Sequence, residues 1–180
     1  MLDWNIDQNW TLFLDRDGVI NQRKMGGYIE KKEEFFFLDH VPEAIAALSS
    51  LFQYVFVVTN QQGIGKKIMT ERNLLEIHTY MCEQIEKAGG KITKCYFAPE
   101  LKSIENSMRK PNSGMALKAK EEFPTIDFSK SIMVGDTDSD ILFGMNLGMK
   151  TVRIKTVEPI GVKSDLEFTS LHEFLEAIRA

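Results

Sequence analysis

Short apolar segments alternate along the whole chain with longer segments of helical pattern, and this alternation restricts the possible folds more than any other feature. The apolar segments, which we expect to be strands, are residues 11–14, 54–58, 92–97, 131–134 and 151–154. They are almost continuously apolar, which is typical of parallel strands covered on both faces. Because strands that alternate with helices form right-handed crossovers, the sequence predicts an α/β fold with a doubly wound parallel sheet.

Helix-boundary residues occur in the segments between these strands. The predicted helix starts are Pro42, Thr70, the candidate N-caps Ser113 and Asp138, and a capping box from Ser170 to Glu173. Residues 21–38 depart from the alternation, because they contain two adjacent glycines and a run of three phenylalanines. This segment predicts a small hairpin flap over one end of the sheet.

Composition agrees with one domain of ordinary size. At 180 residues and 43% apolar content, the chain can bury a full hydrophobic core. No repeat or linker divides it, so we expect a single domain over residues 1–180. The formal charge of −4, from 22 basic and 26 acidic residues, disfavours nucleic acid as a partner.

The sequence also bears on the cellular location. It has no apolar run of about 18 residues, which would predict a membrane span. Its first ten residues lack the basic and apolar parts of a secretory signal. The two cysteines, Cys82 and Cys95, are too few for a disulfide framework. We therefore expect a cytoplasmic protein that does not bind membranes.

Polar residues gather where the predicted strands end, which is where ligands bind in parallel α/β sheets. The first strand leads into Asp15-Arg16-Asp17-Gly18, whose two carboxylates can converge on one cation. Mg²⁺ takes hard oxygen ligands and keeps waters and substrate phosphate, so few carboxylates suffice. Taken alone, these four residues also fit an ordinary turn.

Two further positions in the chain carry hydrogen-bond donors, uncharged at the first and basic at the second. Thr59 and Asn60 come at the end of the second strand, and their hydroxyl and amide groups can bind an anion. Arg109 and Lys110 precede a proline and a predicted helix start, where two cations can reach a phosphate. A solvent-exposed basic pair is the alternative interpretation of these two residues.

The fourth strand ends at an acid cluster formed by Asp136, Asp138 and Asp140. Three carboxylates in a dry pocket repel one another unless a cation is close. Asp136, directly at the strand end, fits a metal ligand, whereas the other two also fit caps of the next helix. The order along the chain is thus an acid pair, a threonine, a lysine and an acid cluster.

That order resembles the four motifs of the haloacid dehalogenase (HAD) superfamily of phosphohydrolases, from Trp10 to Ile154. Residues 15–21, 27–28, 59–65 and 109–115 are similar to the branch that contains D,D-heptose 1,7-bisphosphate 7-phosphatase and histidinol-phosphatase. The resemblance implies a HAD-like Rossmannoid sandwich of three layers. The intervals from Asp17 to Thr59 and from Thr59 to Lys110 are too short for a separate cap domain, so we expect an open site.

The resemblance also implies roles for individual residues. Asp15 would be the nucleophile that forms an aspartyl-phosphate, and Asp17 the general acid and base. Thr59 and Lys110 would donate hydrogen bonds to the transferring phosphoryl group. Mg²⁺ would be held by the carboxylates of Asp15 and Asp136 and by the backbone carbonyl of Asp17.

Substrate-binding residues follow from the same resemblance. Arg109, beside the catalytic lysine, suits recognition of a second phosphate or carboxylate on the substrate, because its guanidinium is a planar fork. Asn60, Gln61 and the segment 23–28 would complete the pocket wall. Asp140 would orient the metal ligands.

One departure from this branch concerns metal content. Its members usually carry a structural zinc loop before the Arg-Lys-Pro motif, but the corresponding positions here are Ala98, Glu100, Asn106 and Met108. This set contains neither Cys nor His, so we expect no structural zinc beside the Mg²⁺. The loop 99–108 is predicted to be shortened and more mobile.

These inferences predict a Mg²⁺-dependent phosphomonoester hydrolase that acts on a small phosphorylated metabolite. The leading substrate implied by the resemblance is D-glycero-D-manno-heptose 1,7-bisphosphate, and histidinol phosphate is the alternative. More distant alternatives are a polynucleotide 3'-phosphatase and a receiver-type phospho-switch. A receiver carries its phosphoacceptor after the third strand, whereas Asp15 follows the first. We expect a monomer or a weak homo-oligomer.

Overall fold

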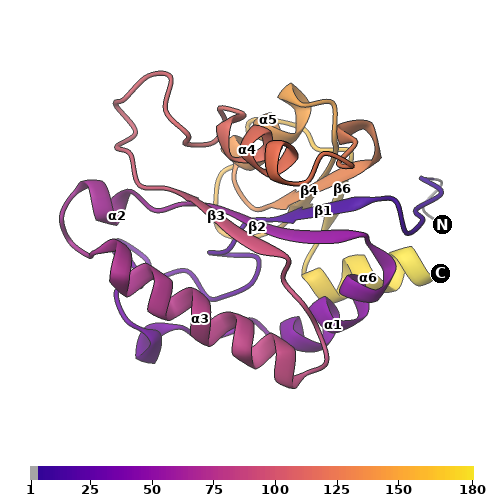
Figure 1. Cartoon of the computed structure of the whole chain (residues 1–180), viewed down its shortest axis with the longest axis horizontal. Coiled ribbons are helices and arrows are strands. Elements are labelled where there is room, and N and C mark those ends of the chain that lie inside the picture. Colours follow the sequence, from indigo (N-terminus) through magenta and orange to yellow (C-terminus); the bar gives the residue numbers. More distant parts are fainter. Residues whose placement is uncertain (1–3) are drawn as a thin grey trace.

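A parallel sheet of six strands forms the centre of the fold, in the order β3-β2-β1-β4-β5-β6 (Figure 1). The computed structural model describes residues 4–180, and all neighbouring strands of the sheet within that range are parallel. The strands are β1 (Thr11–Leu14), β2 (Tyr54–Asn60), β3 (Lys94–Ala98), β4 (Ser131–Gly135), β5 (Lys150–Ile154) and β6 (Leu166–Phe168). The direction in which strands are added reverses between β1 and β4, which confirms the predicted doubly wound topology.

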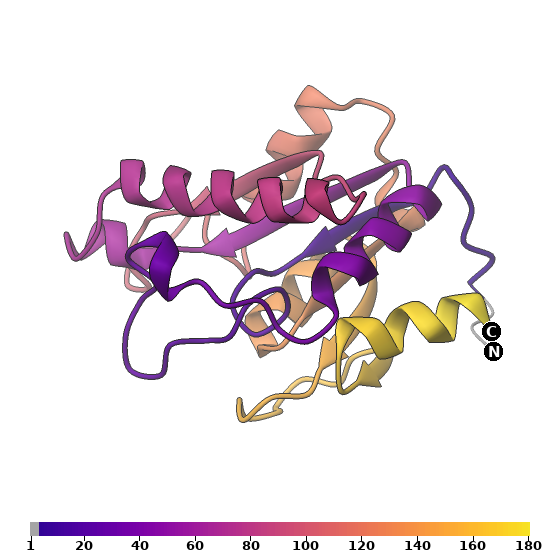
Figure 2. The same cartoon turned by 90° about the horizontal axis from the view of Figure 1, so that it is seen from below.

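Helices cover both faces of this sheet. The helices are α1 (Val41–Leu51), α2 (Gln62–Gly65), α3 (Glu71–Lys87), α4 (Gly114–Glu122), α5 (Asp138–Asn146) and α6 (Leu171–Arg179). α1, α3 and α6 lie on one face, and α4 and α5 lie on the other (Figure 1 and Figure 2). Two 3₁₀ helices, η1 (Lys32–Glu34) and η2 (Phe128–Lys130), lie in connecting segments. None of the helices within residues 4–180 combines the length and the apolar character that a membrane crossing requires.

The side chains of each strand alternate between two hydrophobic cores. In β1, Leu12 and Leu14 are buried in the core under α1, α3 and α6, whereas Phe13 is buried in the core under α4 and α5. In β4, Val134 is buried in the first of these cores and Met133 in the second. Because both faces are covered, both sets of side chains must be apolar, and the strands have the continuous pattern seen in the sequence.

The five strands predicted from the sequence are all present, with small shifts at their ends. The sequence did not predict β6, which pairs with β5 at the edge of the sheet. Its three residues, Leu166 to Phe168, are each only partly buried or exposed. An edge strand this short therefore lacks the buried apolar run that identified the other five.

Residues 21–38 differ from the hairpin expected for them. An antiparallel bridge between Asn21 and Phe37 closes the base of the segment. Beyond that bridge the chain forms turns and η1 instead of two paired strands, and η1 lies against α3 (Figure 2). The physical reason is that Ile29 and Phe35 are buried in the main core, so the segment is anchored by side chains and not by a ladder of backbone hydrogen bonds.

The predicted cap at Asp138 is wrong, because Thr137 is the N-cap of α5. The carboxylate of Asp138 is turned toward Arg153, 2.6 Å from its guanidinium, and also accepts from the N–H groups of Gly161 and Val162. The carboxylate that caps the helix together with Thr137 belongs to Asp140, which accepts from the Thr137 N–H at 3.0 Å.

Two other predicted caps are only partly confirmed. Ser113 is at the N-cap position of α4, but its side chain makes no capping hydrogen bond within residues 4–180. Ser170 accepts from the Glu173 N–H at 3.1 Å, as a capping box requires. The carboxylate of Glu173, however, accepts from the N–H of Thr169 and not from that of Ser170. The reciprocal half of the box is therefore displaced by one residue.

The contrast between Thr70 and Ser113 gives a testable prediction about stability. Thr70 Oγ1 accepts from the Asn73 N–H at 3.1 Å, and the Asn73 side chain accepts from the Thr70 N–H at 2.9 Å. Thr70→Ala should therefore lower the free energy of unfolding by about 1 kcal/mol, measured by urea denaturation. Ser113→Ala is the matched control and should change it by less than about 0.5 kcal/mol. Equal losses in the two variants would contradict this assignment of the caps.

Candidate active site

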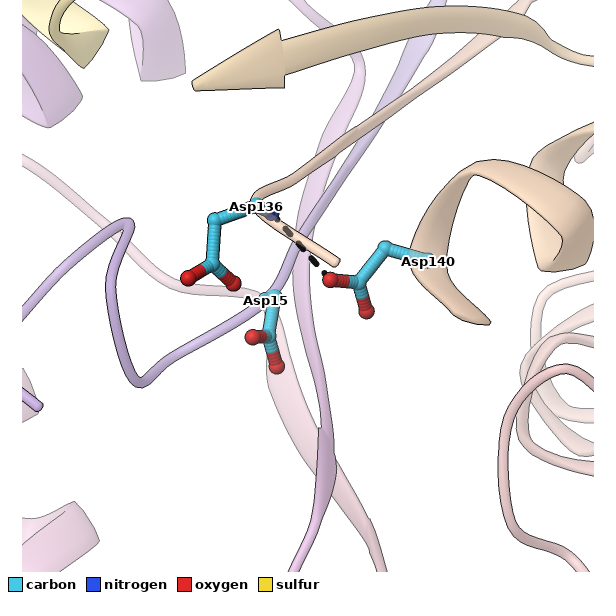
Figure 3. Close-up of side chains that lie close together, drawn as sticks. All are labelled: Asp15, Asp136 and Asp140. Atoms are coloured by element: carbon cyan, nitrogen blue, oxygen red, sulfur yellow. Dashed lines mark hydrogen bonds between the residues drawn. The ribbon is translucent and has the colours of Figure 1, made fainter. Parts of the chain in front are cut away.

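Three carboxylates meet at the point where the strand order reverses. Asp15 follows β1, Asp136 follows β4, and Asp140 is in the first turn of α5. The three side chains converge on one region (Figure 3), and one oxygen of each lies within 4.8 Å of the others. The Asp15 N–H donates to the carbonyl of Val134 at 2.9 Å, which keeps the ends of β1 and β4 aligned.

Two glycines allow these acids to approach the neighbouring backbone. A Cβ at Gly18, whose φ is +92°, would lie 2.3 Å from Asp136 Oδ2. A Cβ at Gly135 would lie 2.1 Å from the Cβ of Asp140. Both distances are shorter than any real side chain tolerates, so larger residues at these positions would push the carboxylates apart.

Lys110 supplies the buried positive charge at the centre of the site. Its ammonium lies 2.8 Å from Asp15 Oδ1, 2.6 Å from Asp140 Oδ1 and 2.7 Å from the backbone carbonyl of Val58. The contacts with Asp15 and the Val58 carbonyl are hydrogen bonds, and the contact with Asp140 is an ion pair. Asn60 holds the backbone of Lys110, because its amide oxygen accepts from the Lys110 N–H at 2.9 Å and its NH₂ donates to the Lys110 carbonyl at 3.2 Å.

The carboxylates remain difficult to ionise despite this cation. Burial, followed by repulsion from Asp140, raises the pKa of Asp15 to about 6. Burial, followed by repulsion from Asp15, raises the pKa of Asp136 to about 7. Burial opposes the charge of Lys110, but its two carboxylate partners raise the pKa of its ammonium, so it stays protonated. The site therefore carries more negative charge than its own lysine neutralises.

Asp17 has a different environment from the other acids. The Arg16 guanidinium donates to its two carboxylate oxygens at 3.0 and 3.1 Å, and Asn21 and Gln61 each donate at 3.0 Å. Burial opposes ionisation here as well, but Arg16 and these donors together hold the pKa of Asp17 below its usual range. Asp17 is thus the stably ionised member of the acid pair.

Arg16 is itself buried and is held from behind by His78. The Arg16 Nη1 lies 3.4 Å from His78 Nε2, and the guanidinium carbon is 6.0 Å from the ring centre of Phe35. Burial, followed by the charge of Arg16, lowers the pKa of His78 to about 3, so the imidazole is neutral and can accept from the guanidinium. This arrangement fixes Arg16 and, through it, the carboxylate of Asp17.

Arg23 covers Asp136 in this structure. Its Nη2 lies 2.9 and 3.0 Å from the two carboxylate oxygens of Asp136 and 3.2 Å from the backbone carbonyl of Asp17. Thr156 donates to Asp136 from the loop after β5, at 3.1 Å. From the same loop, Glu158 lies 3.2 Å from Nη1 of Arg23.

The predicted site residues surround or underlie one polar cavity of about 180 Å³. The predicted residues that line it are Asp15, Asp17, Asn60, Gln61, Arg109, Lys110 and Asp140, together with Arg23, Lys24, Gly27 and Tyr28 of the segment predicted for the pocket wall. Thr59 is buried beneath the cavity, where its hydroxyl accepts from Gln61 at 2.9 Å, and Asp136 is buried beneath Arg23. Arg109 has one buried guanidinium nitrogen, Nη1, without a hydrogen-bond partner in the described part of the chain.

The donor set suits a hard divalent cation. It consists of carboxylate oxygens that are buried, mutually repulsive and only partly neutralised, and a divalent cation would remove that repulsion. Asp15 and Asp136 are the predicted carboxylate ligands, and the predicted carbonyl of Asp17 lies beside them, bonded to the same Arg23 nitrogen as Asp136. Magnesium is the cation that this combination of few carboxylates and an open cavity fits.

Several residues of the site were not assigned by the sequence. Arg16 and Asn21 hold Asp17, while Thr156 and Glu158 come from the loop after β5. The sequence could have indicated Thr156 and Glu158. They follow β5, and a strand that neighbours β4 in a parallel sheet ends at the same edge. Arg23 was expected only in the pocket wall, and nothing in the sequence indicated its contact with Asp136.

A sequence profile described as Polynucleotide kinase 3 phosphatase matches residues 11–168, which include every site residue named above. The chain belongs to this phosphatase family. Its membership, together with the relatives described next, confirms the resemblance to HAD-type phosphatases and places the chain among phosphatase enzymes.

Two curated relatives extend over nearly the whole chain. The D-glycero-alpha-D-manno-heptose-1,7-bisphosphate 7-phosphatase of Campylobacter jejuni is 37% identical over 165 residues, which are 92% of this chain and 93% of that protein. The D-glycero-beta-D-manno-heptose-1,7-bisphosphate 7-phosphatase of Helicobacter pylori is 31% identical over 176 residues, 97% and 99% of the two chains. Among solved structures, the D,D-heptose 1,7-bisphosphate phosphatase of B. bronchiseptica complexed with magnesium and phosphate has a TM-score of 0.83 at 23% identity, over 94% of this chain and 98% of that one.

The raised pKa of Asp136 predicts a pH-dependent effect of Asp136→Asn. In metal-free buffer, folding is favoured by protonated Asp136 and weakens as pH rises from the ordinary carboxyl pKa of 3.8 through about 7. Asparagine mimics the protonated form, so the stability difference, variant minus wild type, should increase by roughly 1–3 kcal/mol between pH 5 and pH 8. Thermal or urea unfolding in EDTA measures it. Glu121→Gln, at an exposed carboxylate, is the control, and a difference that stays constant with pH would contradict the prediction.

Proposed function

We propose that this phosphatase removes one phosphate from D-glycero-D-manno-heptose 1,7-bisphosphate, with Asp15 as nucleophile. The observation that carries this proposal is the buried pair of Asp15 and Lys110, 2.8 Å apart at one wall of a polar cavity. An ammonium in contact with the nucleophile can bind the oxygens of the phosphoryl group that the nucleophile attacks. The names of the Campylobacter jejuni and Helicobacter pylori relatives support the choice of substrate.

The reaction that we propose consists of two displacements at phosphorus. In the first, an oxygen of Asp15 attacks phosphorus, the bond to the sugar oxygen breaks, and Asp17 gives a proton to that oxygen. In the second, water attacks the aspartyl-phosphate, Asp17 takes the proton from the water, and Asp15 is released with inorganic phosphate. Lys110 and Thr59 stabilise the charge on the equatorial oxygens in both steps.

Asp17 is ionised before the substrate binds, and an ionised carboxylate can take a proton from water, as the second displacement requires. For the first step Asp17 must hold a proton, and the negative phosphoryl group bound beside it favours protonation through like-charge repulsion. Gln61 is placed to take part in this change, because the same amide nitrogen donates to Asp17 and to Thr59. When Thr59 turns its hydroxyl to the phosphoryl group, Gln61 keeps Asp17 in place.

Magnesium would be held by Asp15, Asp136 and the backbone carbonyl of Asp17, with Asp140 fixing the surroundings through Lys110 and Thr137. When bound, it supplies positive charge that lowers the repulsion between the nucleophile and the phosphate. The similarity in fold to a phosphatase complexed with magnesium and phosphate supports this part of the proposal.

Arg109 is our candidate for binding the second phosphate of the substrate. It lines the cavity, and its buried Nη1 has no partner within residues 4–180, so a ligand oxygen could use this donor. Burial lowers the pKa of Arg109, but a guanidinium remains charged at any physiological pH. A planar fork of this kind suits a phosphate better than an ammonium does.

We also propose that the loop 99–108 is held without zinc. The Met108 N–H donates to the carboxylate of Glu100 at 3.3 Å, and Asn112 donates to the carbonyl of Ser107 at 3.1 Å. The first of these hydrogen bonds joins the two ends of the loop, and the second ties its C-terminal end to the segment before α4. The remaining features of the proposal are a cytoplasmic enzyme, a monomer or weak homo-oligomer, and no nucleic-acid or membrane partner.

A phosphate-release assay across four substrates tests this function. With Mg²⁺ present, the two anomers of the heptose bisphosphate should be hydrolysed with higher kcat/KM than histidinol phosphate or a 3'-phosphorylated oligonucleotide. Asp15→Asn should reduce turnover by about 10³-fold or more, because the amide is a poor nucleophile, while its thermal unfolding stays cooperative. Preference for the oligonucleotide, or near-normal activity of Asp15→Asn, would contradict the proposal.

The role of Arg109 has its own control within this assay. Arg109→Gln should raise KM for the heptose bisphosphate more than for the 7-monophosphate, which lacks the second phosphate. Arg72→Gln removes an equal charge from an exposed face of α3 and should change neither value. An equal increase for both substrates would assign Arg109 to the reacting phosphate instead.

The acid role of Asp17 predicts a dependence on the leaving group. Asp17→Asn should slow hydrolysis of a sugar phosphate by about 10²-fold or more, because the alkoxide leaves poorly without a proton. An aryl phosphate leaves as a stable phenolate, so its rate of enzyme phosphorylation, measured in a rapid-quench burst, should fall much less. An equal loss with both substrates would argue against an acid role for Asp17.

A further inference from the structure

Arg23 lies where the proposed magnesium ligands converge. One nitrogen, Nη2, contacts both carboxylate oxygens of Asp136 and the backbone carbonyl of Asp17. Asp136 and the Asp17 carbonyl are two of the three groups assigned above to the metal. A cation bound by these oxygens would compete with the guanidinium for them.

We propose that Arg23 is a built-in counter-cation, which holds the metal site together in the absence of magnesium and is displaced when the metal binds. This inference rests on the proposed function, because it takes the magnesium ligands from it. In this role Arg23 moves during metal binding, whereas a residue of the pocket wall would stay in place.

The charges of the site explain why such a residue is needed. Lys110 lies against Asp15, Asp140 and the carbonyl of Val58, and within residues 4–180 its ammonium makes no ion pair with Asp136. The Asp136 side chain is fully buried, and a buried carboxylate without a cation is strongly destabilising. Arg23 supplies that cation from the loop 21–38.

The surroundings of Arg23 also explain how it can leave. Its side chain is 31% exposed, whereas that of Lys110 is 1% exposed. Its loop is closed by the single bridge between Asn21 and Phe37 at its base, so its side chain can move without breaking a strand ladder. Glu158, 3.2 Å from Nη1, offers a partner that remains when the contacts with Asp136 are lost. The displaced guanidinium therefore stays at the edge of the cavity.

Metal binding by variants tests this inference directly. Isothermal titration with Mn²⁺ and with Mg²⁺ at pH 8 gives the Kd for the wild type and for Arg23→Gln. Arg23→Gln should bind about tenfold more tightly, because the metal no longer displaces a bound cation. Arg109→Gln removes an equal charge from the same cavity without touching the metal ligands, and its Kd should change by less than about threefold. Arg72→Gln, on the exposed face of α3, should leave the Kd unchanged.

Thermal unfolding supplies a second readout that does not depend on activity. In EDTA at pH 8, Arg23→Gln should lower Tm by about 5 °C, because Asp136 is left without its partner. At saturating Mg²⁺ the difference from the wild type should disappear. A purely structural role for Arg23 would lower Tm equally in the two conditions and would overturn the inference.

The outcomes separate this inference from the proposed function. If none of the proteins binds Mn²⁺ or Mg²⁺, the proposed metal site is wrong and the inference fails with it. If the wild type binds metal but Arg23→Gln binds no more tightly than Arg109→Gln, only the role of Arg23 is wrong. A crystal structure with Mg²⁺ bound, in which Arg23 still donates to both Asp136 and the Asp17 carbonyl, would also overturn it.

Discussion

The burial of three carboxylates at one edge of the sheet is the constraint on which the rest of the site depends. Asp15 and Asp136 arrive there because β1 and β4 are parallel neighbours, and Asp140 arrives because α5 begins directly after β4. Burial, followed by their mutual repulsion, raises the pKa of Asp15 to about 6 and that of Asp136 to about 7. Such a site is stable only with cations, and this explains why two basic side chains, Lys110 and Arg23, are directed into it.

The side chains proposed to meet the phosphate are positioned by others that do not react. Asn60 uses its whole amide on the backbone of Lys110, and Gln61 connects Thr59 to Asp17. Arg16 holds Asp17 from a fully buried position. A motif such as Asp-Arg-Asp or Thr-Asn-Gln therefore combines reacting groups with the groups that fix them. This explains why neighbouring residues in these motifs have such different exposure and such different pKa shifts.

The loops near the site differ from the sheet edge in how they are held. Residues of the segment 21–38 line the cavity, whereas the loop 99–108 and the residues after β5 line a neighbouring cavity that shares Arg109 and Lys110 with it. Side-chain packing, isolated bridges and hydrogen bonds hold these loops, whereas extended strand ladders hold the sheet. Relatives named for the alpha and for the beta anomer are both more than 30% identical to this chain over most of its length. Overall similarity thus does not distinguish between the two anomers.

The sequence by itself determined the fold class and five of the six strands, because buried parallel strands are continuously apolar. It also indicated which acids, threonine and lysine gather at one sheet edge, because these polar residues follow the ends of the strands. It could not place β6 or the cap at Thr137, since short edge strands and competing acceptors carry little local signal. Only the tertiary structure decided which cation neutralises which acid. Lys110 and Asp15 are 95 residues apart, and Arg23 and Asp136 are 113 apart, so their pairing depends on the packing of distant segments and not on any local pattern.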